Sequence, residues 1–154
     1  MKKVNIKNFK KTLSKFSTGI TVICIKNNNT IYGKTVNSFN SLSLNPPMVL
    51  FSLGNYSSSI NKFLKTKFLS INILSDKQKK LSDNFASSIP KLENINFIEG
   101  KNKTAIIPNC IANLECKLID KIKKGDHIIF VCEILELQSN DKLKPLVYFN
   151  SKYN

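Results

Sequence analysis

Hydrophobic residues near the start of the chain recur at intervals of three and four positions. Ile6, Phe9, Leu13 and Phe16 follow this spacing, and several lysines lie between them. Residues spaced in this way share one face of an α-helix. The pattern therefore predicts an amphipathic helix that packs along a single apolar stripe. Gly19 follows, and glycine is a residue type that commonly ends a helix.

The next two segments have the composition of β-strands. Residues 20–25 form a run rich in β-branched side chains, and residues 30–32 begin a second run. Asn27, Asn28 and Asn29 separate the two runs, and asparagine adopts left-handed backbone angles more readily than most residues. This arrangement predicts a β-hairpin.

A long stretch of mixed polarity, residues 33–51 (GKTVNSFNSLSLNPPMVLF), follows the hairpin. Its first part alternates hydroxyl and amide side chains with apolar ones. Pro46 and Pro47 then force a turn before a short apolar run. Polar groups on a buried strand face need hydrogen-bond partners, so the stretch suits one wall of a concave site for a flat, heteroatom-rich ligand. A half-exposed edge strand with a proline-rich turn is the plainer interpretation, and the stretch alone leaves both open.

A loop rich in serine, residues 52–59, leads into a second helical pattern made by Ile60, Phe63 and Leu64. The first N–H groups of a helix lack intrahelical partners, and serine hydroxyls add further donors. Such a corner can hold a phosphate group. Alternatively, the serines only cap the helix, and the local sequence does not decide between the two roles.

The second half of the chain returns to strand patterns. Residues 68–74 predict a strand, and Ser75 and Gln78 fit a capping box at the start of a third helix. Residues 87–104 are irregular. The remaining predicted features are strands over 105–119 (interrupted near Pro108), 127–137 and 145–149, a turn at 125–127, and a tail at Lys152-Tyr153.

Strands dominate the predicted elements. They do not alternate with helices along the chain, as the strands of a doubly wound sheet would. The phosphate-binding patterns GxGxxG and GxxxxGK[ST] are also absent. In a chain of 154 residues, a closed or nearly closed antiparallel barrel is an economical way to remove sheet edges. We therefore predict one mainly β domain over residues 1–154, with a few short helices.

The net charge of +14 raises the possibility of nucleic-acid binding. However, the lysines are spread along the chain, and arginine and tryptophan are absent. Nucleic-acid-binding proteins usually concentrate positive charge on one face and add arginine or stacking aromatic residues. We therefore expect no nucleic-acid partner, although the charge can attract anionic ligands such as phosphorylated cofactors.

The four cysteines, Cys24, Cys110, Cys116 and Cys132, show no C-x-x-C spacing, and with the single histidine they make no zinc pattern. We therefore predict no metal site and expect reduced, buried thiols. The N-terminus lacks the pattern of a signal peptide, and no apolar run approaches the roughly 20 residues that span a bilayer. We expect a cytoplasmic protein with no membrane partner.

Six segments, taken together, resemble the flavin reductase-like family, whose fold is an FMN-binding split barrel. One such segment would be weak evidence, whereas six in the family's order and spacing are specific. The segments are FSTGITVI (16–23), GKTVNSFNSLSLNPPMVLFSL (33–53), SINIL with its glutamine (70–78), NFA (84–86), GDHIIFVCEI (125–134) and PLVYF with a later tyrosine (145–153).

This resemblance implies an antiparallel Greek-key split barrel that forms a homodimer. It also implies an NAD(P)H:flavin oxidoreductase that binds FMN or FAD and reduces it with NADH or NADPH. Many members of the family are the reductase partner of a separate flavin-dependent monooxygenase. A non-catalytic flavin-binding or electron-transfer protein is the alternative.

The resemblance further implies which residues contact the flavin. Those expected along the edge of the isoalloxazine ring are Thr35, Val36, Asn37 and Ser38, with Ser41 close by. Those expected at the ribityl and phosphate end are Ser52, Ser57, Ser58 and Ser59. Those expected to border the same cleft are Asn72, Ile73, Leu74 and Gln78, and also Tyr148 and Tyr153, for which a core or interface position is the equal alternative.

His127 is the one residue for which the resemblance implies a catalytic role. In the family, the segment that matches Gly125-Asp126-His127 borders the place where the nicotinamide stacks on the flavin, so His127 would orient the nicotinamide nucleotide. A surface turn residue is the plainer interpretation of a lone histidine. The chain also departs from the family pattern: Lys34 replaces an apolar residue, often methionine, and Cys132 replaces a small glycine. Lys34 would either point outward or bring a cation near a flavin or nucleotide phosphate.

Overall fold

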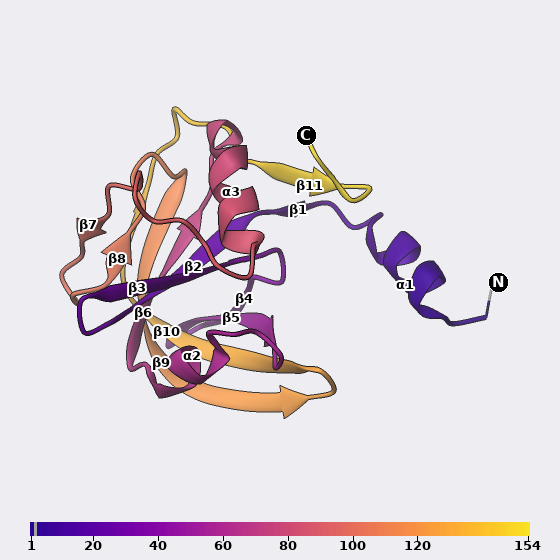
Figure 1. Ribbon diagram of the computed structural model, residues 1–154, viewed down its shortest axis with the longest axis horizontal. Helices are drawn as coiled ribbons and strands as arrows, with labels where there is room; N and C mark the ends of the chain where they lie inside the picture. The colour runs from indigo at the N-terminus through magenta and orange to yellow at the C-terminus, as the bar shows by residue number, and fades with distance from the viewer. Residues whose placement is uncertain (2) are drawn as a thin grey trace.

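Seven strands form one antiparallel sheet in the computed structural model, which describes Met1 and residues 3–154 (Figure 1). Their order across the sheet is β3-β2-β6-β9-β10-β5-β4. The strands are β2 (Thr21–Asn27), β3 (Thr30–Val36), β4 (Asn40–Leu44), β5 (Pro47–Gly54), β6 (Phe68–Ile73), β9 (Ala112–Lys124) and β10 (His127–Ser139). The hairpins β2–β3, β4–β5 and β9–β10 are joined by antiparallel pairing of β6 with β2 and β9, and of β10 with β5. The prediction of a mainly β, antiparallel fold is confirmed.

Two smaller sheets flank the main one. The first has the order β1-β11-β12, and its strands are β1 (Thr18–Gly19), β11 (Val147–Phe149) and β12 (Lys152–Tyr153). The second pairs β7 (Ile98–Glu99) with β8 (Ala105–Ile106). The segment expected to be a C-terminal tail is therefore a strand, because β12 folds back on β11 after a turn at Asn150 and Ser151, both with positive φ.

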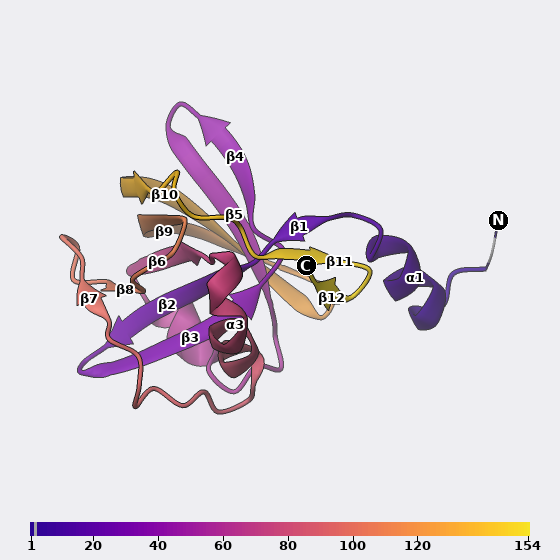
Figure 2. The same cartoon turned by 90° about the horizontal axis from the view of Figure 1, so that it is seen from above.

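Short helices cover parts of the main sheet. They are α1 (Ile6–Leu13), α2 (Ile60–Lys65), the 3-10 turn η1 (Asp76–Gln78) and α3 (Lys79–Ala86). Helix α3 lies against β3 (Figure 2) because the fully buried ring of Phe85 occupies the space beside Gly33. Any side chain at position 33 would overlap that ring. Among the helices of the described residues, none has the length and apolar character needed to span a lipid bilayer.

Helix α1 does not pack along its apolar stripe, contrary to the sequence-based expectation. It extends away from the sheet (Figure 2), and Ile6 and Phe9 are 76% and 56% exposed. The helix itself is well formed, because the side chain of Asn5 accepts a hydrogen bond from the backbone N–H of Asn8 at its first turn. Within this chain, the stripe has no sheet surface to cover.

Two hydrophobic clusters lie on opposite sides of the sheet. The first contains Phe51 and Phe130, which stack with ring centroids 5.0 Å apart, and Phe63 from α2, which meets Phe130 edge-on. The second contains Phe85, and it lies under α3 and the small β1-β11-β12 sheet. The central strands are therefore buried on both faces, and their core residues come from all parts of the chain.

Asn72 in β6 is the most connected polar residue of this interior and is fully buried. Its amide nitrogen donates to the carbonyl of Val22 (3.0 Å) and to the hydroxyl of Ser70 (3.1 Å). Its amide oxygen accepts from the backbone N–H of Ile107 (2.9 Å) and the side chain of Asn113 (2.8 Å). A buried amide with all these partners fixes how β2, β6, β9 and the segment after β8 fit together.

The mixed stretch at 33–51 is not one continuous strand. Strand β3 ends at Val36, and β4 begins only at Asn40. Strand β4 lies at the edge of the sheet, where Ser41 is exposed. The edge-strand interpretation therefore holds for the second half of the stretch, and only residues up to Ser38 are candidates for a concave site.

We predict that Asn72→Ala destabilises the fold strongly. The substitution leaves several buried donors and acceptors without partners, so the free energy of unfolding should fall by about 2–4 kcal/mol. Urea denaturation followed by circular dichroism measures this loss. Asn61→Ala, at an exposed position of α2, is the matched control and should change stability by less than about 0.5 kcal/mol. Equal effects of the two substitutions would contradict a structural role of the Asn72 network.

Candidate functional site

A groove opens where the ends of β3, β5 and α3 meet the start of β10. Its volume is about 440 Å³, within the range typical of small-molecule sites. We call it the serine groove; its lining residues are Lys34, Thr35, Val36, Asn37, Ser38, Ser52, Leu53, Gly54, Tyr56, Ser57, Ser58, Ala86, Ser88 and His127. Eight of the sixteen residues expected at the site from the sequence are in this set.

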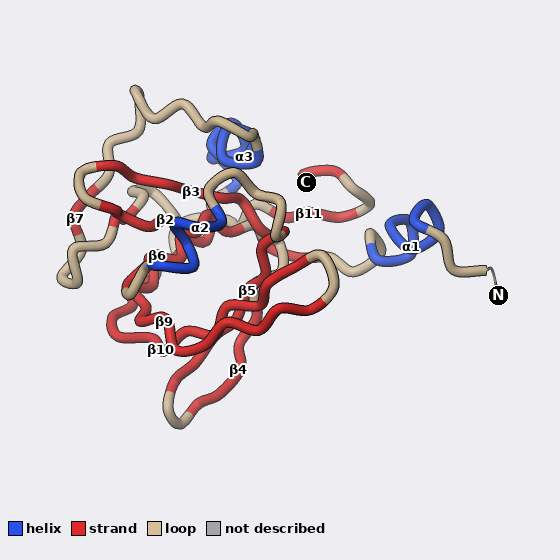
Figure 3. The backbone as a smooth tube through the Cα atoms, turned by 60° about the horizontal axis from the view of Figure 1, so that its bottom comes forward, coloured by secondary structure: helices blue, strands red, loops and turns tan. Residues whose placement is uncertain are grey.

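Ser38 joins two strands that are not neighbours in the sheet. Its hydroxyl donates to the carbonyl of Ser52 in β5 (3.1 Å) and accepts from the N–H of the same residue (3.0 Å). In the strand order, β3 lies at one end of the sheet, and β5 and β4 lie at the other. Because the sheet curves strongly (Figure 3), the residues just after β3 nevertheless reach β5. This pair of hydrogen bonds holds the two sides of the groove together.

The hydroxyl of Thr35 connects the groove to α3, so its hydrogen is not available for a hydrogen bond to a ligand. Its hydroxyl donates to the carbonyl of Ser82 (2.7 Å), and the Ser82 hydroxyl is 2.9 Å from the hydroxyl of Tyr153. Tyr153 in turn meets Tyr148 edge-on at 5.4 Å between centroids. The two tyrosines therefore pack against α3 and support the groove from outside, which is the core alternative stated for them.

The serine loop before α2 is open on its groove side. Ser59, at the N-cap position of α2, makes no side-chain capping hydrogen bond, so the capping interpretation of these serines is wrong for it. The hydroxyls of Ser57 and Ser59 are 3.4 Å apart, and Ser58 donates to the carbonyl of Ser88 (3.2 Å). Helix α2 has only six residues, so the donors here are those of the loop and not of a long helix dipole.

Several main-chain donors along the groove remain available. Within the described part of the chain, the backbone N–H groups of Asn37, Ser38 and Ser58 donate no hydrogen bond. The side chain of Asn37 is exposed beside them. A ligand with several acceptor atoms along one edge can therefore be bound without disrupting existing bonds.

His127 is the first residue of β10 and lies opposite Gly54 of β5. Its ring nitrogen Nδ1 is 2.7 Å from a carboxylate oxygen of Asp126, and the hydrogen bond to His127 lowers the pKa of that carboxyl. An ionised carboxylate only accepts hydrogen bonds, so Nδ1 carries the proton and Nε2 is left for other contacts. The N–H of Asn55 donates to the Asp126 carbonyl (2.9 Å), which ties this turn to the loop after β5.

The charge on the groove wall is positive. None of its lining residues is acidic, and Lys34 contributes an ammonium group that donates to the carbonyl of Ser87 (2.9 Å). Partial burial lowers the pKa of this lysine. A bound anion would restore the stability of the charged amine, so the groove favours anionic ligands.

Three residues expected to border the cleft do not line the serine groove, because they pack or form hydrogen bonds elsewhere in the protein. Asn72 has all its hydrogen-bond partners in the interior, and Leu74 is fully buried in the second cluster. Gln78 accepts from the N–H of Ser75 (3.0 Å) and donates to the carbonyl of Pro108 (2.9 Å). The capping-box prediction at Ser75 and Gln78 is confirmed by that first bond.

Other expected residues also lie outside the groove. Ile73 packs against the first cluster, and Ser41 is exposed on the edge strand β4. Ser59 lines an adjoining pocket instead. The structure also adds wall residues that were not among the expected site residues: Leu53, Gly54, Tyr56, Ala86 and Ser88. Ser88 lies in the irregular segment, where no periodicity could indicate which side chains turn inward.

The cysteines take no part in this site. All four are buried free thiols, as expected. Burial raises the pKa of Cys110 to about 11 and that of Cys132 to about 12. It raises the pKa of Cys24 and Cys116 as well. A protonated, buried thiol is neither a nucleophile nor a redox centre at neutral pH.

Comparison with known proteins gives consistent matches. The model of the flavin reductase like domain matches residues 13–154. The FMN reductase (NADH) SmoA of Agrobacterium fabrum is 33% identical over 137 residues, which cover 89% of this chain and 79% of that protein. The reductase component of a 4-hydroxyphenylacetate 3-monooxygenase from Thermus thermophilus is 32% identical, over 94% of this chain and 93% of that one. The solved structure of the flavin reductase PheA2 superposes with a TM-score of 0.92 at 34% identity, covering 98% of this chain and 97% of that chain.

We predict that Ser38→Ala loosens the groove. The substitution removes both bonds to Ser52, so the free energy of unfolding should fall by about 1–3 kcal/mol. Ser41→Ala is the matched control, because Ser41 is exposed and its hydroxyl makes no hydrogen bond within the described residues; it should change stability by less than about 0.5 kcal/mol. Urea denaturation compares the two. If Ser38→Ala proved as harmless as the control, the bridge would not hold the groove together.

Proposed function

The chain belongs to the flavin reductase like domain family, and from this membership we propose that it is an NADH-dependent flavin reductase that binds its flavin in the serine groove. The observation that carries the proposal is the combination of hydroxyl and amide donors with His127 in one groove that contains no acidic residue. A flat ring with acceptor atoms along its edge and an anionic tail fits this lining.

The residues of the groove suit the two ends of a flavin. Asn37 and the available N–H groups of Asn37 and Ser38 lie where a ring edge would find donors. Ser57 and Ser58, at the other end, have hydroxyl groups for a phosphate, with Lys34 nearby as a cation. Ser52 holds Ser38 in position through the two hydrogen bonds between them. Val36 provides a buried apolar contact for the ring.

When bound, flavin supplies a ring nitrogen, N5, that accepts a hydride from C4 of the nicotinamide. The contribution of the protein is then mostly positioning, because the reacting atoms must lie about 3–3.5 Å apart. His127 is placed to bind and orient the nicotinamide nucleotide from the edge of the groove. Asp126 fixes the proton on Nδ1 and so determines which nitrogen faces the nucleotide. No side-chain nucleophile takes part.

A separate flavin-dependent monooxygenase is the partner that relatives suggest. Several are reductase components or subunits of monooxygenases, including the Thermus thermophilus protein and the HsaB subunit of Mycobacterium tuberculosis, which is 29% identical over 153 residues. We propose that this chain likewise supplies reduced flavin to an oxygenase. Such transfer requires a groove that releases its flavin, and an open groove on the surface is consistent with release.

Oxidation of NADH, followed at 340 nm with the purified protein and either FMN or FAD, tests the proposed activity. We expect a rate at least tenfold above that of flavin and NADH without protein. A yellow complex that does not oxidise NADH would instead favour the non-catalytic flavin-binding alternative. Absence of both binding and turnover would refute the proposal.

We predict that His127→Ala impairs the use of NADH more than the binding of flavin. Loss of nucleotide positioning should lower kcat/KM for NADH by about 10- to 100-fold. The flavin dissociation constant, measured by fluorescence quenching, should change by less than about threefold. Asn55→Ala, in the adjacent loop but outside the groove lining, is the control. An unchanged turnover number and an unchanged KM for NADH would remove His127 from the mechanism.

We also propose that the sheet is a Greek-key split barrel and that two copies of this single domain form a homodimer. The Ser38–Ser52 bridge supports closure of the barrel. The exposed stripe of α1 supports the dimer: Leu13 and Phe16 are 57% and 75% exposed, and Leu44 on the edge strand is 94% exposed. Because α1 extends away from its own sheet, a second copy is the surface that can bury this stripe.

The dimer proposal predicts that substitutions on the apolar stripe lower the molecular mass measured by light scattering after gel filtration. Phe9→Gln combined with Leu13→Gln should shift the protein from two copies to one at micromolar concentration. The control pair, Lys7→Gln with Lys11→Gln, lies on the polar side of the same helix and should leave the mass unchanged. A monomeric wild-type protein would refute the dimer.

A further inference from the structure

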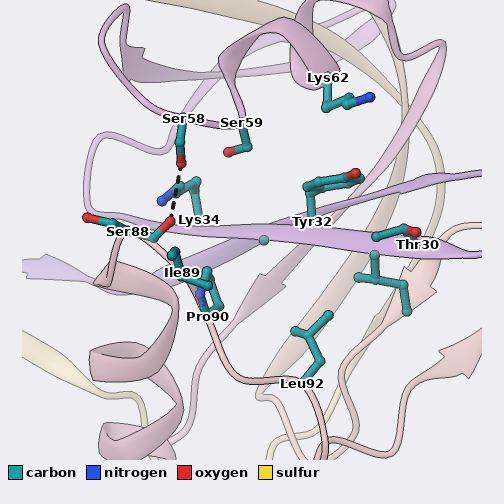
Figure 4. Close-up of a pocket in the computed structure, with 12 residues that line it drawn as sticks. Thr30, Tyr32, Lys34, Ser58, Ser59, Lys62, Ser88, Ile89, Pro90 and Leu92 are labelled. Carbon is teal, nitrogen blue, oxygen red and sulfur yellow. Dashed lines mark hydrogen bonds between the residues drawn. The ribbon is translucent and has the colours of Figure 1, made fainter.

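A second cavity continues from the serine groove past its phosphate end. It has a volume of about 290 Å³ and lies between β3, α2 and the segment after α3 (Figure 4). Lys34, Ser58 and Ser88 line both cavities. Ser58 donates a hydrogen bond to the Ser88 carbonyl (3.2 Å) where the two cavities adjoin. An elongated ligand that extends past these two residues would occupy both.

We propose that this adjoining pocket binds the adenosine diphosphate half of FAD, so that the protein uses FAD in preference to FMN. The proposal rests on the proposed function, because it assumes that the flavin ring and ribityl chain lie in the serine groove. FMN ends at its phosphate, whereas FAD continues through a second phosphate into adenosine. The pocket begins at the serine loop where that phosphate would lie.

The boundary between the cavities has the chemistry that a diphosphate requires. Lys34 stands there with an ammonium group that has one hydrogen bond, to the Ser87 carbonyl. Within the described residues, neither Lys34 nor Lys62 forms an ion pair, and no acidic residue lines either cavity. A partly desolvated, unpaired cation at the junction of two cavities is well placed for the charge between them.

The far part of the pocket has the chemistry that an adenine requires. Figure 4 shows Tyr32 and Lys34 rising on the same side of β3 toward Ser59 and Lys62. Lys62 lies 5.9 Å from the centroid of the Tyr32 ring. Ile89 and Leu92 add apolar contacts on the other wall. An aromatic ring with apolar neighbours and a cation at the rim suits a purine joined to a sugar.

The orientation of the pocket favours the flavin over the nicotinamide nucleotide as the source of this group. His127 lines the groove but not the adjoining pocket. Adenosine diphosphate is also part of NADH, whose nicotinamide would lie beside His127. Because the pocket adjoins the end of the groove where the flavin phosphate would lie, we assign it to the adenosine diphosphate half of FAD and not to that of NADH.

Dissociation constants for FAD and FMN, measured by fluorescence quenching for the wild type and three variants, test the proposal. We expect the wild type to bind FAD at least about tenfold more tightly than FMN, as one or two charge-assisted contacts would give. Lys34→Met, which restores the residue common in the family, and Tyr32→Leu should each reduce this preference by about fivefold or more. Lys121→Met is the matched control, since Lys121 also donates to a backbone carbonyl, that of Leu64 at 3.0 Å, but outside both cavities. It should leave the preference unchanged.

The other outcomes are distinguishable. Equal affinity for FAD and FMN in a wild type that oxidises NADH would overturn this inference and leave the proposed function intact. Variants that raise the KM for NADH with FMN as acceptor, without changing the FAD preference, would overturn it by assigning the pocket to the nicotinamide nucleotide. A protein that binds neither flavin would overturn both. Circular dichroism of each variant confirms that the fold is retained.

Discussion

The hydrogen bonds between Ser38 and Ser52 are the constraint on which the site depends. Strand β3 ends two residues before Ser38, and β5 is far from β3 in the strand order. One hydroxyl, acting as donor and acceptor at once, holds these two segments together. Without this closure, the N–H groups after β3 and the serine loop after β5 would be parts of separate surfaces. The groove therefore lies where a polar residue links two segments at a point where backbone pairing has stopped.

Most strands, and the pairing of β2 with β3 in a hairpin, could be predicted from the sequence, because those features depend on local chemistry. The β2–β3 turn at Asn28 has positive φ, which asparagine tolerates. The β9–β10 turn has Gly125 at φ +57°. In β5, burial alternates along the strand, so one face meets the core, whereas β2 and β6 are buried on both faces and show no such alternation. Long-range pairing, such as that of β1 with β11, could not be derived in this way, since strands of two and three residues have no periodicity to detect.

Predictions for the site likewise succeeded where they depended on neighbouring residues and failed where they depended on residues distant in the sequence. Residues 35–38 and Ser57 and Ser58 of the serine loop line the groove, because neighbours in a short segment reach the same place, whereas Ser41 and Ser59 lie outside it. Asn72 and Gln78 do not line it either, although both carry amides that suit a ligand equally well. An amide in a sequence gives no sign of whether its partners are internal. Here those partners come from Ile107, Asn113 and Pro108, which are about 30 to 40 positions away and on other elements.

The net charge of +14 explains less of the recognition than its size suggests. Charges separated by more than about 8 Å of solvent are largely screened at physiological ionic strength, so lysines spread over the surface raise the rate of encounter with anions but do not select among them. Selection depends on the few groups that line the cavity. There the acidic residues are absent, the serine hydroxyls are arranged by the fold, and Lys34 is partly removed from water. A lysine-rich composition is therefore a property of the whole chain, whereas the proposed selection of an anionic ligand rests on the groups that line the groove, among them Lys34.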